Sequence, residues 1–127
     1  MAHTIYVHGK RSADGNFADC TYSKDWEGHE GIPGQELHIP VGAGECVFAQ
    51  GELSELQLIG ATFKTIGSVA GMNASNFAPA DDEYAVHIPM PAYTITKGVV
   101  LLFSTTGTVE NLYPSSDPQV INDQPTC

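Results

Sequence analysis

The longest segment without glycine or proline reads NFADCTYSKDWE and covers residues 16–27. It holds Thr21, Tyr22 and several turn formers, but no apolar stripe at helical spacing. Glycine and proline disfavour helix interiors, and 13 Gly and 8 Pro interrupt the rest of the chain more often still. A long helix therefore has no place in this sequence, and we predict an almost entirely β protein.

Short runs rich in β-branched and aromatic residues lie between these breaks. Runs of this composition, bounded by turn residues, are typical of strands. The expected strands are residues 4–8, 17–22, 36–40, 46–49, 53–59, 62–69, 84–88, 93–96, 99–104 and 108–113. Short strands in this number favour an antiparallel two-sheet sandwich of the jelly-roll or Greek-key type.

The sequence also predicts several of the turns and loops that connect these runs. Asp14–Gly15 and Lys97–Gly98 are expected turns, because glycine accepts positive φ without a steric penalty. Residues 26–34, rich in glycine, are expected to form an exposed loop, and Pro79 can begin a single helical turn. The strongly apolar segment 99–103 is predicted to be a strand buried on both faces.

The apolar positions of the expected strands define a core. We predict that it is built from Ile5, Val7, Phe17, Leu37, Ile39, Val47, Leu56, Leu58, Phe63, Val86, Ile88, Val99, Leu101 and Phe103.

The length of 127 residues fits one domain. We place that domain at residues 1–113 and an extended C-terminal arm at 114–127. Pro114, Pro118 and Pro125 keep the arm extended and remove hydrogen-bond donors from it. We therefore expect the arm and the first residues of the chain to lie across neighbouring subunits in an assembly.

The charge balance excludes some partners. The chain has five basic and 15 acidic residues, which gives a formal charge of -10. Binding to a nucleic-acid backbone or an anionic membrane needs Lys and Arg, so neither partner is expected. No apolar run suggests a signal peptide or a membrane span, so we expect synthesis in the cytoplasm. The three cysteines, Cys20, Cys46 and Cys127, have no CxxC spacing, and we expect Cys20 and Cys46 to be small buried hydrophobes.

A catalytic or metal-binding constellation is not evident. The five histidines show no HxH pair, and no G-x-S-x-G nucleophile motif occurs. His29 beside Glu30 is the one seed of a proton-transfer pair, and Asp81–Asp82–Glu83 reads as a solvated acidic turn. We expect no catalytic residues, no metal and no cofactor.

Trp26 is the only tryptophan and lies in the glycine-rich loop with Tyr22 nearby. Aromatic residues on exposed loops are favoured where a partner buries them, although Trp26 can equally fold back onto the sandwich. The expected partner-contact residues come from this loop and from the two chain ends: Trp26, Tyr22, His3, Thr4, Pro114, Pro118, Val120, Ile121 and Pro125.

An acidic single β domain with abundant Gly, Thr and Ser and with extended arms resembles the decoration or cement proteins of tailed-phage heads. The resemblance lies in the character of the whole chain. It implies a non-enzymatic dimer or trimer that binds the outer face of the major capsid protein in the virion and stabilises the shell.

Two alternatives remain open. In a carbohydrate-binding jelly roll, such as a lectin or a fibre tip, Trp26 and Tyr22 would stack on the sugar while Asp25 and Glu27 accept its hydroxyl hydrogen bonds. In a small cupin-like enzyme, His29, His38 or His87 would be the candidate base.

Overall fold

A computed structural model describes residues 3–32, 36–65, 76–90, 93–105, 112–115 and 119–124. These residues form eleven β-strands and contain no α-helix. They accordingly include no helix with the length and apolar character that crossing a membrane requires. The predicted all-β class is confirmed.

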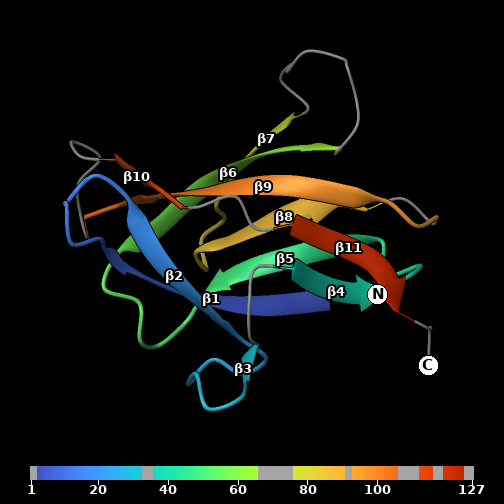
Figure 1. The fold of residues 1–127 in the computed structure, drawn as a ribbon, viewed down its shortest axis with the longest axis horizontal. Coiled ribbons are helices and arrows are strands. Elements are labelled where there is room, and N and C mark those ends of the chain that lie inside the picture. The colour runs from blue at the N-terminus through green and yellow to red at the C-terminus, as the bar shows by residue number, and fades with distance from the viewer. Residues whose placement is uncertain are drawn as a thin grey trace.

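The strands form two sheets (Figure 1). The first sheet has the order β3-β2-β1-β5-β8 and consists of β1 (His3–Arg11), β2 (Ala18–Ser23), β3 (Gly31–Ile32), β5 (Glu45–Gln50) and β8 (Ala85–Pro89). The second sheet has the order β4-β11-β9-β6-β7 and consists of β4 (Glu36–Pro40), β6 (Gln57–Thr65), β7 (Phe77–Pro79), β9 (Thr96–Ser104) and β11 (Gln119–Gln124), while β10 (Leu112–Pro114) pairs with β9.

The two sheets pack face to face around one core, as a sandwich does. The core cluster draws buried side chains from both sheets, among them Phe48 from the first and Phe103 from the second, both with no exposed surface. Every predicted core residue except Phe17 is buried. Phe17 is 51% exposed because it ends the β1–β2 turn, one residue before β2 begins. Val47 is buried but lies outside the main core cluster.

The pairing is mixed, so the prediction of purely antiparallel sheets is wrong. β1 runs parallel to β5, and β4 runs parallel to β11. Parallel neighbours need a long connection to return the chain in the same direction, and both pairs have one. Local sequence patterns carry no information about such distant pairings.

The C-terminal arm is also corrected. Pro114 belongs to β10. Ser115 is buried and forms an isolated β-bridge with Ala18. β11 lies between β9 and β4, and its Val120 has no exposed surface. The prolines flank this strand instead of interrupting it, so the backbone donors of 119–124 are available for pairing. The domain therefore continues through β11, while Pro118 and Pro125 fall outside the described residues.

Turn predictions had mixed outcomes. The Asp14–Gly15 turn is confirmed, with Gly15 at φ 77°. Lys97 and Gly98 instead lie inside β9, where Gly98 pairs with Lys64 of β6. The expected loop 26–34 contains the short β3, and Pro79 ends β7 without starting a helical turn.

Two further strand predictions change. The expected strands 53–59 and 62–69 are replaced by β6, which covers 57–65 and carries an irregularity between Leu58 and Gly60. Residues 66–69 lie outside the described residues. Residues 93–95 precede β9, and the segment 99–103 is fully buried on one face only, because Val100 and Leu102 are half-buried.

Candidate functional site

His8 is a buried titratable side chain close to the surface loops, with 5% of its surface exposed. It lies on β1 opposite Thr21, on the outer side of the first sheet. Its Nε2 lies 2.8 Å from the Ser23 hydroxyl, and its Nδ1 accepts a hydrogen bond of 3.1 Å from the backbone N–H of Leu53. The imidazole thus joins the end of β2 to the loop after β5.

These bonds define the tautomer of neutral His8. A backbone N–H can only donate, so Nδ1 carries no proton and Nε2 donates to Ser23. The Ser23 hydroxyl in turn donates to the carbonyl oxygen of Asp25 at 2.6 Å. A histidine that activates a serine must accept the hydroxyl proton, and here the direction is reversed. His8 and Ser23 therefore anchor two loops and do not form a nucleophile–base pair.

Two glycines make room for the His8 ring. A Cβ atom on Gly51 would lie 2.1 Å from Cε1 of His8, and one on Gly28 would lie 3.3 Å from the same atom. Gly28 also has φ +83°, which few side chains tolerate. The sequence reasoning missed this anchor because His8 meets Ser23 and Leu53 at separations of 15 and 45 residues, with no local motif.

Acidification is expected to destabilise the fold through His8. Burial lowers the pKa of His8 from 6.5, and this effect outweighs the opposing charges of Asp25 and Glu52. The unfolded chain therefore binds the proton more readily than the folded one. This stability contribution is fully present above pH 6.5 and is lost as the pH falls through 6.5 toward the lower folded-state pKa.

A His8→Asn variant tests this expectation, because asparagine keeps an acceptor near the position of Nδ1 but does not titrate. Urea unfolding at about pH 7.5 and about pH 5.5 should give a larger loss of stability in the wild type than in the variant. His3, whose pKa burial lowers, and His87, whose pKa is raised, are present in both proteins and cancel in the comparison. Equal losses in both proteins would contradict the role of His8.

The loop held by His8 presents Trp26, which is 52% exposed, as the sequence predicted for this segment. The backbone carbonyl of Trp26 accepts a 2.8 Å hydrogen bond from the N–H of Glu52, so the two loops are also joined directly. Leu53 on the second loop is 61% exposed. Trp26 and Leu53 thus expose an aromatic and an aliphatic side chain on two loops that His8 links.

Acidic groups flank Trp26. Within the ranges that the structure describes, one group of three potential metal ligands occurs, and its ligand atoms lie within 4.8 Å of one another: Asp25, Glu27 and His29. The Asp25 carboxylate already accepts the backbone N–H groups of His29 at 3.0 Å and Glu30 at 2.8 Å. These bonds hold the pKa of Asp25 below its usual range and make this side chain a cap of the loop.

The other histidines named as candidate bases are dispersed. His87 on β8 bridges Glu45 and Asp81, each at 3.0 Å, and hydrogen bonds to both carboxylates raise its pKa. His38 lies on β4 in the other sheet, and His29 lies on the β2–β3 loop. The structure therefore does not gather them into one site.

The outer face of the second sheet is apolar where β7, β6, β9 and β10 lie side by side. Opposite residues in antiparallel pairs point to the same face. Phe77, Thr62 and Val100 form one row by this rule, and Pro79, Gly60, Leu102 and Pro114 form the next, with Leu112 beside them. We call these eight residues the outer apolar face. None is charged, and Phe77 and Leu112 are each 54% exposed.

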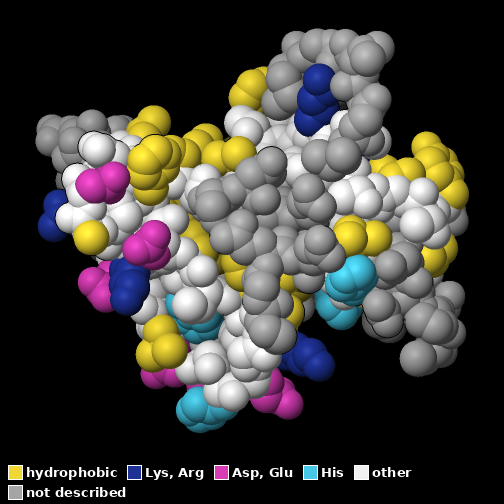
Figure 2. Space-filling model, viewed as in Figure 1, with side chains coloured by type: hydrophobic (Ala, Val, Ile, Leu, Met, Phe, Trp, Pro, Cys, Tyr) yellow, Lys and Arg dark blue, Asp and Glu magenta, His cyan; other side chains and the backbone are white. Residues whose placement is uncertain are grey.

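The first sheet has a different outer surface. Lys10 lies opposite Asp19, and Val47 lies between Thr4 and His87. In Figure 2, hydrophobic side chains gather at the upper left, where Figure 1 places β10 and the β1–β2 turn, with charged side chains beside them, while acidic and histidine side chains gather at the bottom, near the β2–β3 loop. One face of a solvated sheet is normally polar, so the outer apolar face is the exception.

The expected contact residues separate into three groups. Tyr22 and Val120 are buried at 4% and 0% exposure, and the Tyr22 ring packs edge-on against Phe48, so neither can contact a partner, which corrects the prediction. Thr4 and Trp26 are exposed, whereas His3, Pro114 and Ile121 are half-buried. The remaining two, Pro118 and Pro125, lie outside the described residues.

The cysteines fit a packing role. Cys46 is buried in the core, as predicted, and Cys20 is half-buried against it. Burial raises the pKa of each thiol to about 12, which removes the thiolate needed for nucleophilic attack at neutral pH. Cys127 lies outside the described residues.

Comparison of the sequence with models of known protein families and with curated proteins finds no match. The geometry of the described residues is therefore the basis for any assignment.

Proposed function

We propose that this protein is a non-enzymatic structural protein that decorates and stabilises a viral capsid by binding the outer face of the major capsid protein. The outer apolar face is the observation that carries the proposal. Covering exposed apolar surface with a partner lowers the free energy by about 25 cal/mol per Å². A flat sheet face suits a broad protein surface better than it suits a small molecule, which needs a concave site.

The size of the face suits the centre of an interface. Four strands about 4.8 Å apart, of which β7 and β10 are three residues or about 10 Å long, make a face on the order of 200 Å². The largest apolar patch on a typical monomer covers about 300–600 Å², so this face is a smaller patch. A standard interface buries about 800 Å² on each partner, so polar surroundings must supply the remainder.

The charge of the chain agrees with a position outside the shell. A formal charge of -10 is repelled by packaged nucleic acid, whereas the capsid exterior imposes no such cost. We include assembly as a dimer or trimer in the proposal, as the family resemblance implies. Light scattering of the purified protein measures that state directly.

Placing charge on the outer apolar face is expected to weaken attachment strongly. Phe77→Glu combined with Leu112→Glu leaves the core intact, because both side chains are more than half exposed. The affinity for heads assembled from the major capsid protein of the same genome should fall more than about tenfold in co-sedimentation, since central apolar contacts dominate binding energy.

Leu53→Glu is the matched control, because Leu53 is an equally exposed hydrophobic on the loop after β5, beside the first sheet. It should bind as the wild type does. The proposal fails if the double variant binds normally, if the wild type does not bind, or if the genome encodes no capsid protein.

A carbohydrate-binding role is a second candidate, and the exposed Trp26 beside the Glu27 carboxylate is the observation that favours it. Rings of sugars stack on such surfaces while carboxylates accept hydroxyl protons. Trp26 is the only tryptophan, so its fluorescence reports this site alone. A saturable fluorescence change with saccharides, together with normal capsid binding by the double variant, would favour this candidate over capsid decoration.

A further inference from the structure

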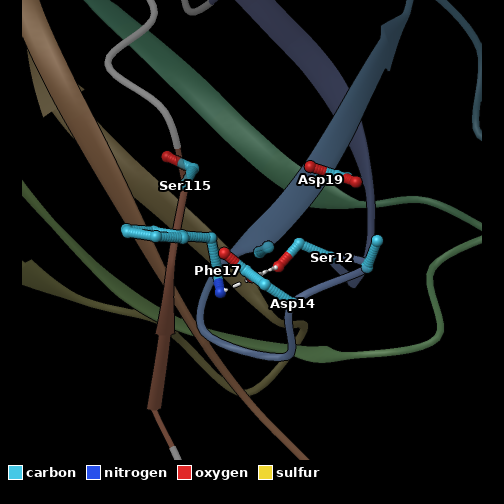
Figure 3. Close-up of a pocket in the computed structure, with 7 residues that line it drawn as sticks. Ser12, Asp14, Phe17, Asp19 and Ser115 are labelled. Atoms are coloured by element: carbon cyan, nitrogen blue, oxygen red, sulfur yellow. Dashed lines mark hydrogen bonds between the residues drawn. The ribbon is translucent and has the colours of Figure 1, made fainter.

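A hollow of about 550 Å³ opens at the tip of the β1–β2 turn, where the first sheet meets β10 of the second (Figure 3). Its lining residues are Ser12, Ala13, Asp14, Phe17, Ala18, Asp19 and Ser115. In Figure 3, Ser12 and Asp14 lie in the turn, Asp19 on β2 and Ser115 at the end of β10. The hollow therefore lies at the end of β10, whose Pro114 belongs to the outer apolar face and directly precedes Ser115.

The floor of the hollow is held by paired hydrogen bonds. The Ser115 N–H donates to the carbonyl of Leu101 at 2.8 Å, and the Leu101 N–H donates to the Ser115 hydroxyl at 2.8 Å. Ser115 also forms an isolated parallel β-bridge with Ala18 of the first sheet, and both residues are buried. The two sheets are thus tied together beneath the hollow, which keeps its shape defined.

The rim is acidic. Asp14 accepts hydrogen bonds at Oδ1 from the Ser12 hydroxyl at 2.6 Å and from the Asn16 N–H at 3.0 Å, and these bonds lower its pKa. A carboxylate has a second oxygen, which can accept from an incoming donor. Asp19 supplies another carboxylate, and the lining residues include no Lys or Arg. The lining therefore holds two carboxylates and no cation, while Lys10 lies opposite Asp19 on β1.

Phe17 adds an aromatic wall. Its side chain is 51% exposed, although it is a large hydrophobic residue that the sequence pattern assigns to the core. The electron-rich face of an aromatic ring attracts cations, and a guanidinium group both stacks on such a ring and pairs with carboxylates through its planar fork. An exposed ring that lines the same hollow as two carboxylates matches arginine better than it matches a neutral or acidic group.

We propose that this hollow receives an arginine side chain of a partner protein whose neighbouring apolar surface covers the outer apolar face. The inference rests on the proposed function, because it takes the ligand to be part of a protein. The arginine would pair with Asp14 and Asp19 while its guanidinium plane lies against Phe17. Such a contact supplies polar surroundings that the apolar face needs to form a complete interface.

Binding of a small probe tests the hollow without any capsid. N-acetyl-arginine amide, added to isotopically labelled protein at low ionic strength, should cause saturable NMR shifts at residues 12–19 and Ser115. N-acetyl-citrulline amide has nearly the same shape without the charge and should cause none. The Asp14→Asn/Asp19→Asn variant should bind the arginine probe at least about fivefold more weakly, because it keeps the hydrogen-bonding shape but loses both charges.

Asp82→Asn is the matched control, since it removes one exposed carboxylate from the turn before β8, away from the hollow. Its probe affinity should equal that of the wild type, and the single variant Asp19→Asn provides the test if the double variant loses its dispersed spectrum. Equal shifts with citrulline, or unchanged affinity without the two carboxylates, would overturn the inference. Capsid attachment is scored separately, so a hollow that binds arginine on a protein that binds no capsid would reject the proposed function alone.

Discussion

Deletion of residues 117–127 is expected to abolish cooperative folding. The deletion removes β11, which pairs with β9 on one side and is the strand partner of β4 on the other. Leu37 and Ile39 of β4, both without exposed surface, would lose the strand that holds them in the sheet. Because a domain of this size is stable by only about 5–15 kcal/mol, losing two strands from one sheet exceeds what the fold can absorb.

Thermal unfolding followed by circular dichroism measures this effect. The truncated chain should show no cooperative transition, whereas deletion of residues 125–127 alone, which leaves β11 intact, should give a melting curve like that of the full chain. A folded truncated protein with a normal transition would mean that 117–127 is an accessory arm, as the proline spacing by itself suggests.

Leu101→Ala is expected to lower the free energy of unfolding by about 2–5 kcal/mol. Leu101 has no exposed surface, lies in the middle of β9 opposite Ala61, and points into the core between the sheets. Alanine would leave a cavity there that the surrounding close-packed side chains can fill only in part. The backbone bonds between Leu101 and Ser115 remain, so the loss comes from packing.

Urea unfolding at neutral pH tests this substitution. Leu53→Ala makes the same chemical change at a side chain that is 61% exposed, and it should alter stability by less than about 0.5 kcal/mol. If Leu101→Ala is as mild as Leu53→Ala, Leu101 does not contribute to a packed core and the sandwich arrangement of β9 is wrong.

Much of the fold follows from local chemistry. Glycine and proline breaks exclude long helices, and runs such as 37–39 and 86–89 alternate buried and exposed residues, so both their strand character and their inward positions could be predicted. Asp14–Gly15 likewise has the composition that a tight turn needs. These features depend only on residues close together in the sequence.

The remaining parts depend on distant partners. The short strands β3 and β7 have little β-forming composition of their own, and they become strands because β2 and β6 offer them hydrogen bonds. Local sequence predicts Gly98 to be a turn residue, and only its pairing with Lys64 of β6 shows that it lies inside a strand. The same limit hides the outer apolar face, because Thr62 and Val100 meet only through the register of β6 with β9. Trp26 could be placed on a loop, with the exposure of its ring left open, whereas the His8 anchor beneath it could not be predicted.

Cryo-electron microscopy of capsids mixed with this protein tests the central claim most directly. Heads assembled from the major capsid protein of the same genome should carry regular added density on their outer surface. We expect β7, β6, β9 and β10 to face the capsid, with the β1–β2 turn over an arginine of the capsid protein. Bare heads, or density attached through the β2–β3 loop and Trp26 with the second sheet exposed to solvent, would contradict it.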